Sequence, residues 1–291
     1  MISIRIQGGL GNQLFMVFAT LAYGMQHNVK VVFPYDYQVG QRHTYWETLL
    51  DSMKMFTTAN PENGVTNDNI LWLPIYQEPE FLYRTIPTFG ENMCMIGYFQ
   101  SYKYFESVQN TIFTMMKLEE KQLAIANKYD FFSDITIAMH FRMGDYKSKR
   151  YYHPVMNYEY FEASLDHIME RIKEKEKVRV LYFCEKEDNE YVGLQIARMH
   201  KKYPVDFVKV DDSIEDYNQL LIMSLCDHHI ISNSSFSWWG AYLCRKTDAQ
   251  TVCYPSKWFG EYYEHTHDHK NMMPDSWSKI VSNPIPWDEP L

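Results

Sequence analysis

The residues best suited to binding or catalysis lie at the end of an apolar stretch, ITIAMHFRMGDY, at residues 135–146. Ile135 to His140 is too short for a helix and predicts a buried strand that delivers Arg142 and Asp145 to its end. Ligands of open α/β sheets bind beyond the carboxyl ends of the strands, so His140, Arg142 and Asp145 are expected in a cleft. Arginine suits a phosphate there, because its planar guanidinium can donate two parallel hydrogen bonds to phosphate oxygens. A surface turn closed by an Arg142–Asp145 ion pair explains this stretch alone equally well.

Polar residues also follow a later apolar stretch, HIISNSSFSWWGAYL, at residues 229–243. A strand is expected to end at Ser232 and a helix to begin near Ser235, with Asn233 and Ser234 between them. Serine and asparagine are strong helix N-caps, and capping alone is a sufficient role for them. The same pattern places free backbone amides and serine hydroxyls at the carboxyl end of a parallel strand. It therefore also predicts an anion site suited to a diphosphate.

A glycine-rich loop, QGGLGNQ at residues 7–13, joins a short strand of alternating isoleucines to an apolar helical pattern from Leu14 to Met25. Glycines at such a junction let backbone amides approach a ligand, and the helix start adds partial positive charge. The spacing matches neither the dinucleotide fingerprint nor the P-loop, so a tight turn is the simpler explanation of the loop alone. The candidates for a donor-binding role are Gly9, Gly11, Asn12 and Gln13.

The order of the expected elements predicts an α/β fold with a parallel, Rossmann-like sheet in the second half of the chain. The expected strands there are residues 135–141, 178–184, 205–210, 228–232 and 251–254, and the expected helices are 158–176, 188–202, 214–226 and 235–246. The first half is less regular. Its expected elements after the first helix are strands 30–34 and 93–99 and helices 104–117 and 119–129. A domain boundary is expected near residue 130.

The composition limits the classes of partner. A net charge of −9 and a pI near 5.7 argue against nucleic acid, which requires a basic surface. With 46% hydrophobic and 22% charged residues the chain is expected to be globular, and no stretch reaches the length of a membrane span. The aromatic content is 16%, with 23 Tyr and 7 Trp. An aromatic core is the simpler explanation, but a surplus of such rings also suits sugar recognition.

The cysteines and histidines give no clear metal or disulfide signal. Five cysteines without a CxxC pair predict reduced, buried thiols and a reducing, cytoplasmic compartment. Three histidines alternate within EHTHDHK at residues 264–270. A metal site there is an alternative to the simpler view that these histidines face solvent.

Four motifs occur together in this order: GGLGNQLF at 8–15, HxRxGDY at 140–146, SNSSFSWWGAYL at 232–243 and YPSKWFG at 254–260. Together they resemble the α1,2-fucosyltransferase family, inverting enzymes that use GDP-fucose. The resemblance implies a GT-B-like α/β fold, with two Rossmann-like domains facing a central cleft. These would be an acceptor-side domain at 1–130 and a nucleotide-sugar-binding domain at 131–275, followed by a C-terminal tail at 276–291. It also implies no divalent metal and no cofactor beyond the donor substrate.

The resemblance carries roles onto particular residues. Arg142 matches the arginine that contacts the donor diphosphate, and Asn12 matches the asparagine of the N-terminal loop. The phosphate loop corresponds to Ser234, Ser235 and Phe236. One departure is Met143, where many relatives have a second arginine, and it leaves the identity of the 6-deoxyhexose open.

The implied reaction is transfer of fucose from GDP-fucose to the 2-hydroxyl of a terminal galactose, with inversion. Arg142 and the serine loop would neutralise the leaving GDP, where charge develops. His140 and Asp145 are candidates for the base by position, although Asp145 could instead orient Arg142. The alternatives are another GDP-6-deoxyhexose or acceptor, or a non-catalytic module that binds nucleotide sugar or glycan. The expected partners are a nucleotide sugar and a glycan acceptor, and peripheral contact with a membrane is left open.

Overall fold

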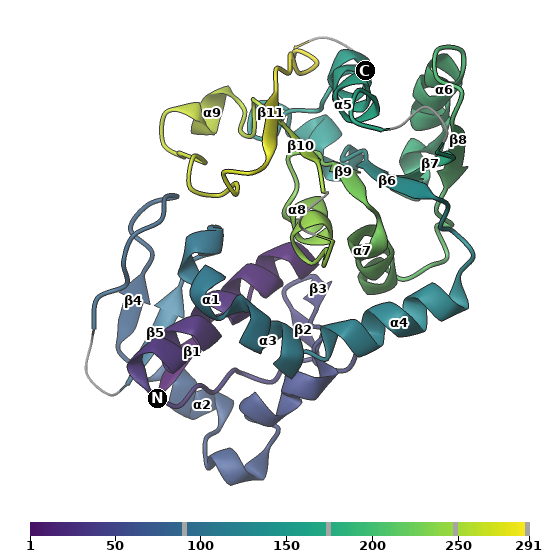
Figure 1. Cartoon of the computed structure of the whole chain (residues 1–291). Helices are drawn as coiled ribbons and strands as arrows, with labels where there is room; N and C mark the ends of the chain where they lie inside the picture. Colours follow the sequence, from purple (N-terminus) through teal and green to yellow (C-terminus); the bar gives the residue numbers. More distant parts are fainter. Residues whose placement is uncertain (89–91, 173–175, 247–249, 289–291) are drawn as a thin grey trace. The chain divides into compact units, whose positions relative to one another are not determined.

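The computed structural model describes residues 1–88, 92–172, 176–246 and 250–288 (Figure 1). The chain divides into two compact units. The first contains Met1–Lys121 and Thr266–Pro274, and the second contains Gln122–His265 and Asp275–Leu291. Both units carry parallel sheets with helices, which confirms the predicted α/β class. Within the described residues, no helix combines the length and apolarity needed to cross a membrane.

The first unit is built on a three-stranded parallel sheet in the order β1-β5-β4. Its strands are β1 (Ile2–Ile4), β4 (Ile75–Gln77) and β5 (Met93–Ile96). Helix α1 (Leu10–His27) follows β1, and its almost continuous run of buried residues from Leu10 to Gly24 forms much of this unit's core. The smaller elements are β2 (Gln38–Val39), β3 (Arg42–His43), α2 (Asn67–Leu71) and α3 (Gln109–Met115), with 3-10 segments at Asp51–Phe56, Pro61–Asn63, Tyr102–Tyr104 and Glu106–Val108.

Two predictions for the first half of the chain are wrong. The segment 30–34 forms no strand but two isolated bridges, Val31 to Ile2 and Phe33 to Thr57, because these alternate residues pair with different partners and no ladder continues. The helix expected at 104–117 is broken, since the backbone at Phe105 adopts φ −134° and ψ −1°, outside the helical region. Only the second part of that segment is α-helical, as α3.

The second unit contains a six-stranded sheet in the order β11-β10-β9-β6-β7-β8, and every pair in it is parallel. The strands are β6 (Ile135–His140), β7 (Val178–Phe183), β8 (Asp206–Lys209), β9 (His228–Ile230), β10 (Val252–Pro255) and β11 (Ser278–Ile280). The helices are α5 (Tyr158–Met169), α6 (Asn189–His200), α7 (Asp216–Leu225), α8 (Ser235–Tyr242) and α9 (Glu261–Glu264). Helix α4 (Leu118–Lys128) precedes β6. The five strands predicted after residue 130 are confirmed, and β11 was not predicted.

The sheet of the second unit is covered on both faces, which explains its apolar strands. Helices α5 and α6 lie on one side and α7 and α8 on the other (Figure 1). Strand β6 is buried from Thr136 to His140, and the core around it includes Leu165 of α5 and Val180 of β7. Because the chain leaves β6 toward β7 and later returns to place β9 on the other side of β6, the strand order reverses between β6 and β9. Ligands of open α/β sheets bind at such a reversal.

Candidate active site

The carboxyl ends of β6 and β9 are joined by hydrogen bonds at the point where the strand order reverses. The hydroxyl of Ser232 donates to the carbonyl of His140 at 2.6 Å, and the backbone N–H of Arg142 donates to the same hydroxyl at 3.2 Å. The loop after β6 therefore lies directly against the loop that leads into α8. The structure thus brings together the two polar stretches that the sequence singled out in the second half of the chain.

The guanidinium of Arg142 is held by acidic side chains on two loops. It forms ion pairs with Asp145 and with Glu185, and it lies 4.7 Å from the ring centre of Tyr146. Asp145 also accepts from Lys149 at 3.3 Å. The Arg142 side chain is only 20% exposed, so its orientation is well defined before any ligand binds. Asp145 therefore orients Arg142, and the three charges of Arg142, Asp145 and Glu185 sum to −1.

Glu185 was missed by the sequence analysis, although a signal was present. It directly follows the apolar run VRVLYFC that forms β7, and β7 is the parallel neighbour of β6. A charged residue at that position reaches the same edge of the sheet as Arg142. Gly144 fits closely here: its φ is +34°, and a Cβ at this position would overlap the Glu185 carboxylate. Its N–H donates to the buried carboxylate of Asp188 at 2.9 Å, which fixes the turn after β6.

His140 is buried and neutral. It is 8% exposed, and its Nδ1 has no hydrogen-bond partner among the described residues. Burial, followed by the nearby charge of Arg142, lowers the pKa of His140 to about 3. Its ring lies 5.6 Å from that of Phe236, at the start of α8. A pKa this low makes His140 a weak proton acceptor at neutral pH, but its Nδ1 can still take part in a hydrogen bond.

The N-terminus of α8 lacks the side-chain cap that the sequence predicted. Ser234 occupies the N-cap position with an extended backbone, φ −138° and ψ 127°, yet its side chain makes no capping hydrogen bond. Asn233 has a structural role instead, since its amide donates to the carbonyls of Pro154 at 3.0 Å and Trp258 at 3.1 Å. The Ser234 side chain therefore leaves the N-terminus of α8 uncapped, and the helix dipole there favours negative charge.

The glycine-rich loop belongs to the first unit and is described there by itself. Helix α1 begins after Gly9, and Gly11 is buried within its first turn. The amide of Gln13, which is 1% exposed, donates to the carbonyls of Gly8 and His43, each at 2.9 Å. These contacts give Gln13 a role in the fold of the loop. The carbonyl oxygen of Asn12 accepts from the amide of Gln100 at 2.7 Å.

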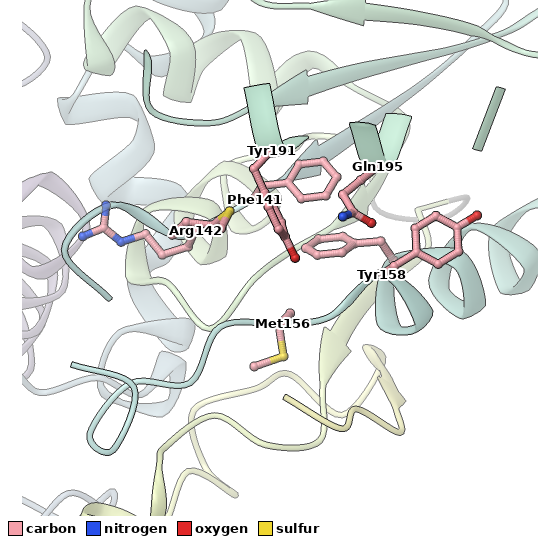
Figure 2. A pocket seen from close by; sticks show the side chains of 8 residues that line it. Phe141, Arg142, Met156, Tyr158, Tyr191 and Gln195 are labelled. Carbon is pink, nitrogen blue, oxygen red and sulfur yellow. The ribbon is translucent and has the colours of Figure 1, made fainter. Parts of the chain in front are cut away.

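A small pocket lies beside the end of β6, but the arginine side chain does not enter it. The pocket is lined by Phe141, Arg142, Met143, Met156, Tyr158, Phe161, Tyr191 and Gln195. Figure 2 shows the guanidinium of Arg142 pointing away from the rings of Phe141, Tyr158 and Tyr191. The arginine is thus directed toward its carboxylate partners on the polar side of the loop.

Comparison of the sequence with known protein families identifies the family of this chain. The sequence model described as "Glycosyl transferase family 11" matches residues 77–275, which is more than half of the chain. The chain belongs to this family. The match confirms the resemblance to α1,2-fucosyltransferases that the four motifs suggested. Family 11 membership makes the protein a glycosyltransferase, whose partners are a nucleotide sugar and a glycan acceptor.

Two relatives from Escherichia coli match this chain over nearly its whole length. The O-antigen biosynthesis glycosyltransferase WbnK is 24% identical, and the match covers 94% of this chain and 99% of the relative. An alpha-1,2-colitosyltransferase is 25% identical, with 95% of this chain and 97% of the relative covered. Among solved structures, the glycosyl transferase family 9 protein from Veillonella parvula matches with a TM-score of 0.45 and 10% identity, over 96% of this chain and 86% of the other.

One group of carboxylates in the described part of this family 11 protein is close enough to share a metal ion. Glu185, Glu187 and Asp188 have oxygens within 4.8 Å of one another. The ammonium group of Lys147 already forms ion pairs with two of these carboxylates, with its Nζ 2.6 Å from Asp188 and 3.6 Å from Glu187. The alternating histidines at 265–269 form no such group among the described residues.

The arrangement can stabilise an anion that departs from the sheet edge. An arginine fixed by two ion pairs and a helix N-terminus without a side-chain cap lie on adjoining loops of one unit. Each favours negative charge, the first through a directed guanidinium and the second through amides and the helix dipole.

Proposed function

We propose that this family 11 protein transfers fucose from GDP-fucose to the 2-hydroxyl of a terminal galactose, with inversion at the anomeric carbon. The observation that carries the proposal is the placement of Arg142 beside the N-terminus of α8 at the reversal of strand order. GDP is a poor leaving group unless its developing charge is stabilised, and both features act where that charge develops.

In the proposed reaction the sugar passes through an oxocarbenium-like state while the bond to GDP breaks. Arg142 binds the diphosphate in place of one of its carboxylate partners. The hydroxyls of Ser234 and Ser235 and the backbone N–H of Phe236 donate to the remaining oxygens. The neutral imidazole of His140 donates a hydrogen bond to the same group. The acceptor oxygen bonds to the anomeric carbon from the face opposite GDP, and its proton passes late in this step to solvent water, so a strong base is not required.

The wider assignment rests on the same proposal. We infer a GT-B arrangement, in which the second unit holds the donor and the first unit, through Asn12 and the glycine loop, serves the acceptor side. The groups assigned to the diphosphate are all protein groups, so the reaction proceeds without a divalent metal. The five cysteines are free and buried, which is compatible with a cytoplasmic protein.

The test is GDP release by the purified protein from GDP-fucose, with and without methyl β-galactoside, followed by NMR of the product. We expect acceptor-dependent release, an α1,2 linkage, and unchanged activity in excess EDTA. Ser234→Ala should weaken GDP binding by less than about tenfold, because it removes one hydroxyl and leaves the amides. GDP binding without turnover would instead indicate a binding module. Loss of activity in EDTA that zinc or manganese restores would contradict the metal-free mechanism.

A second candidate donor is GDP-activated colitose. It is favoured by the match to an alpha-1,2-colitosyltransferase. The ratio of kcat/KM for the two GDP sugars with one acceptor decides between them. A ratio above ten in favour of the colitose donor would replace fucose in the proposal.

A further inference from the structure

Four large aromatic side chains of the second unit are exposed next to one another. Tyr151 and Tyr152 are each 39% exposed, Trp287 is 51% exposed and Tyr262 is 53% exposed. The ring of Tyr151 lies 5.5 Å from that of Trp287 and 5.9 Å from that of Tyr262, which lies 4.7 Å from Tyr152. We call these four residues the aromatic patch. Grouped rings that remain half in solvent are typical of a binding surface.

The fold assembles the aromatic patch from segments that are distant in sequence. The N–H of Tyr262 donates to the carbonyl of Tyr151 at 3.2 Å, and the N–H of Gly260 donates to the carbonyl of Tyr152 at 2.9 Å. A Cβ at Gly260 would overlap the backbone of Tyr151, so this close approach requires glycine. The patch is therefore fixed by backbone hydrogen bonds and does not depend on chance contact between mobile side chains.

The aromatic patch is connected to the candidate active site through further rings. Tyr152 contacts Tyr263, with ring centres 5.7 Å apart, and Tyr263 lies 5.8 Å from His153. His153 is stacked on Tyr146 at 4.7 Å, with an interplanar angle of 19°. Tyr146 in turn lies beneath the guanidinium of Arg142. An unbroken series of rings therefore leads from the proposed leaving-group site to the exposed patch, all within one unit.

The surroundings of the aromatic patch fit a neutral, hydroxylated ligand better than a membrane. An exposed acidic residue precedes or follows its two most exposed rings in sequence, Glu261 before Tyr262 and Asp288 after Trp287. Binding to anionic lipid needs basic residues at the rim. The two basic residues before Tyr151 are already engaged, since Lys149 is paired with Asp145 and Arg150 donates to the carbonyl of Pro286 at 2.7 Å. Sugars offer apolar C–H faces that pack on aromatic rings and hydroxyls that bond phenol and indole groups.

We propose that the aromatic patch is a subsite for an oligosaccharide acceptor. It would bind the sugars that lie beyond the one that receives the transferred residue. The inference rests on the proposed function, because it takes the reacting end of the acceptor to lie at Arg142. It places the binding of these further sugars on the aromatic patch, and it gives the second unit a part in acceptor binding as well as donor binding.

The test compares a short and a long acceptor. Methyl β-galactoside and a tetrasaccharide ending in β-galactose are assayed with wild type and with the double variant Tyr262→Ala/Trp287→Ala. In wild type, KM should be at least tenfold lower for the tetrasaccharide. The double variant should raise KM for the tetrasaccharide about tenfold, the scale expected from two lost aromatic contacts. Its kcat with methyl β-galactoside should stay within twofold of wild type.

The matched control removes two exposed apolar side chains elsewhere on the chain, Leu123→Ala/Leu194→Ala, which are 61% and 68% exposed. It should behave as wild type. Equal KM values for the two acceptors in wild type, or an unchanged KM for the tetrasaccharide in the double variant, would overturn the proposal. If wild type transfers nothing, the proposed function fails. Calorimetry with the tetrasaccharide in the absence of donor then still tests whether the aromatic patch binds a glycan. Binding lost in the double variant supports it, and binding absent from wild type or equal in both proteins overturns it.

A membrane role is separated by sedimentation with phosphatidylcholine and phosphatidylglycerol vesicles. We expect wild type to remain in the supernatant. Wild type that sediments with vesicles while the double variant does not would assign the aromatic patch to a lipid surface and overturn the glycan subsite.

Discussion

Glu185→Gln should strengthen the binding of GDP. Glu185 is one of two carboxylates on the Arg142 guanidinium, and in the ligand-free protein it occupies a side of the guanidinium that a phosphate needs. Glutamine keeps the length of the side chain and an oxygen that accepts from Arg142, but it removes one negative charge. The sum of charges at Arg142, Asp145 and position 185 rises from −1 to zero.

The size of the effect follows from the geometry and exposure of the pair. Two anions on opposite sides of a guanidinium are roughly 6 Å apart, and their repulsion is about 0.7 kcal/mol in water and about 3 kcal/mol at an effective dielectric constant of 20. The Glu185 side chain is 46% exposed, so a value near the aqueous limit applies. A gain of about 1 kcal/mol lowers the Kd for GDP about fivefold.

Calorimetry with GDP at low and high salt measures this gain, which should shrink as ionic strength rises. The matched control is Glu187→Gln, on the same loop, whose carboxylate faces Lys147 at 3.6 Å and does not pair with Arg142. It should change the Kd by less than twofold. Weaker GDP binding in Glu185→Gln would refute the reasoning, because it would mean that Glu185 positions Arg142 more than it competes with the phosphate.

Four further results are expected. Arg142→Lys should lower kcat about 10²- to 10³-fold, because lysine lacks the planar fork, and a variant within threefold of wild type would remove Arg142 from the mechanism. Ser235→Pro should weaken GDP binding about tenfold more than Ser235→Ala in calorimetry, since proline fits the first helical position yet deletes an amide donor, and equal losses would move the phosphate elsewhere. Gly144→Ala should lower the free energy of unfolding in urea by more than about 1 kcal/mol, because φ is +34°. The control Gly193→Ala, whose Cβ would meet nothing within 4 Å, should not destabilise. Finally, the pKa of His140 is lowered to about 3 in the folded protein, against about 6.5 when unfolded, so the unfolded state binds the extra proton between these values. The free energy of unfolding should therefore fall as the pH drops from 7 to 4. The urea midpoint of His140→Gln should fall less over that range than the midpoint of wild type. Equal falls in the two proteins would mean that His140 is protonated in the folded state.

The sequence predicted the second unit well because its strands are buried on both faces. Runs such as ITIAMH and VRVLYF are mostly apolar and are followed by polar residues, so the sequence marks where each strand ends. Strands β4 and β11 lack this signal. Each has only three residues, at least partly exposed, and no local pattern separates them from the loops around them. Their pairing is decided by contacts with distant strands.

The sequence singled out polar residues that lie close together in the structure, but it did not reveal their contacts. The motifs brought out Arg142, Asp145 and Ser234, and the structure sets all three at one edge of the sheet. The partnership of Arg142 with Glu185 joins residues 43 positions apart, which only the register of β6 and β7 reveals. The missing cap at Ser234 was likewise hidden, since a serine before a helix has the same sequence whether its hydroxyl binds the helix or not.

The return of Thr266–Pro274 to the first unit bears on how the protein is synthesised. Phe81 pairs with His267, and the hydroxyl of Ser101 donates to the carbonyl of Asn271, so these late residues are part of that unit's structure. Domains usually fold in order as they leave the ribosome. Here the first unit stays incomplete until the segment at 266–274 has been translated, and the second waits for β11 after it. The two units must therefore finish folding almost together, once β11 has been translated.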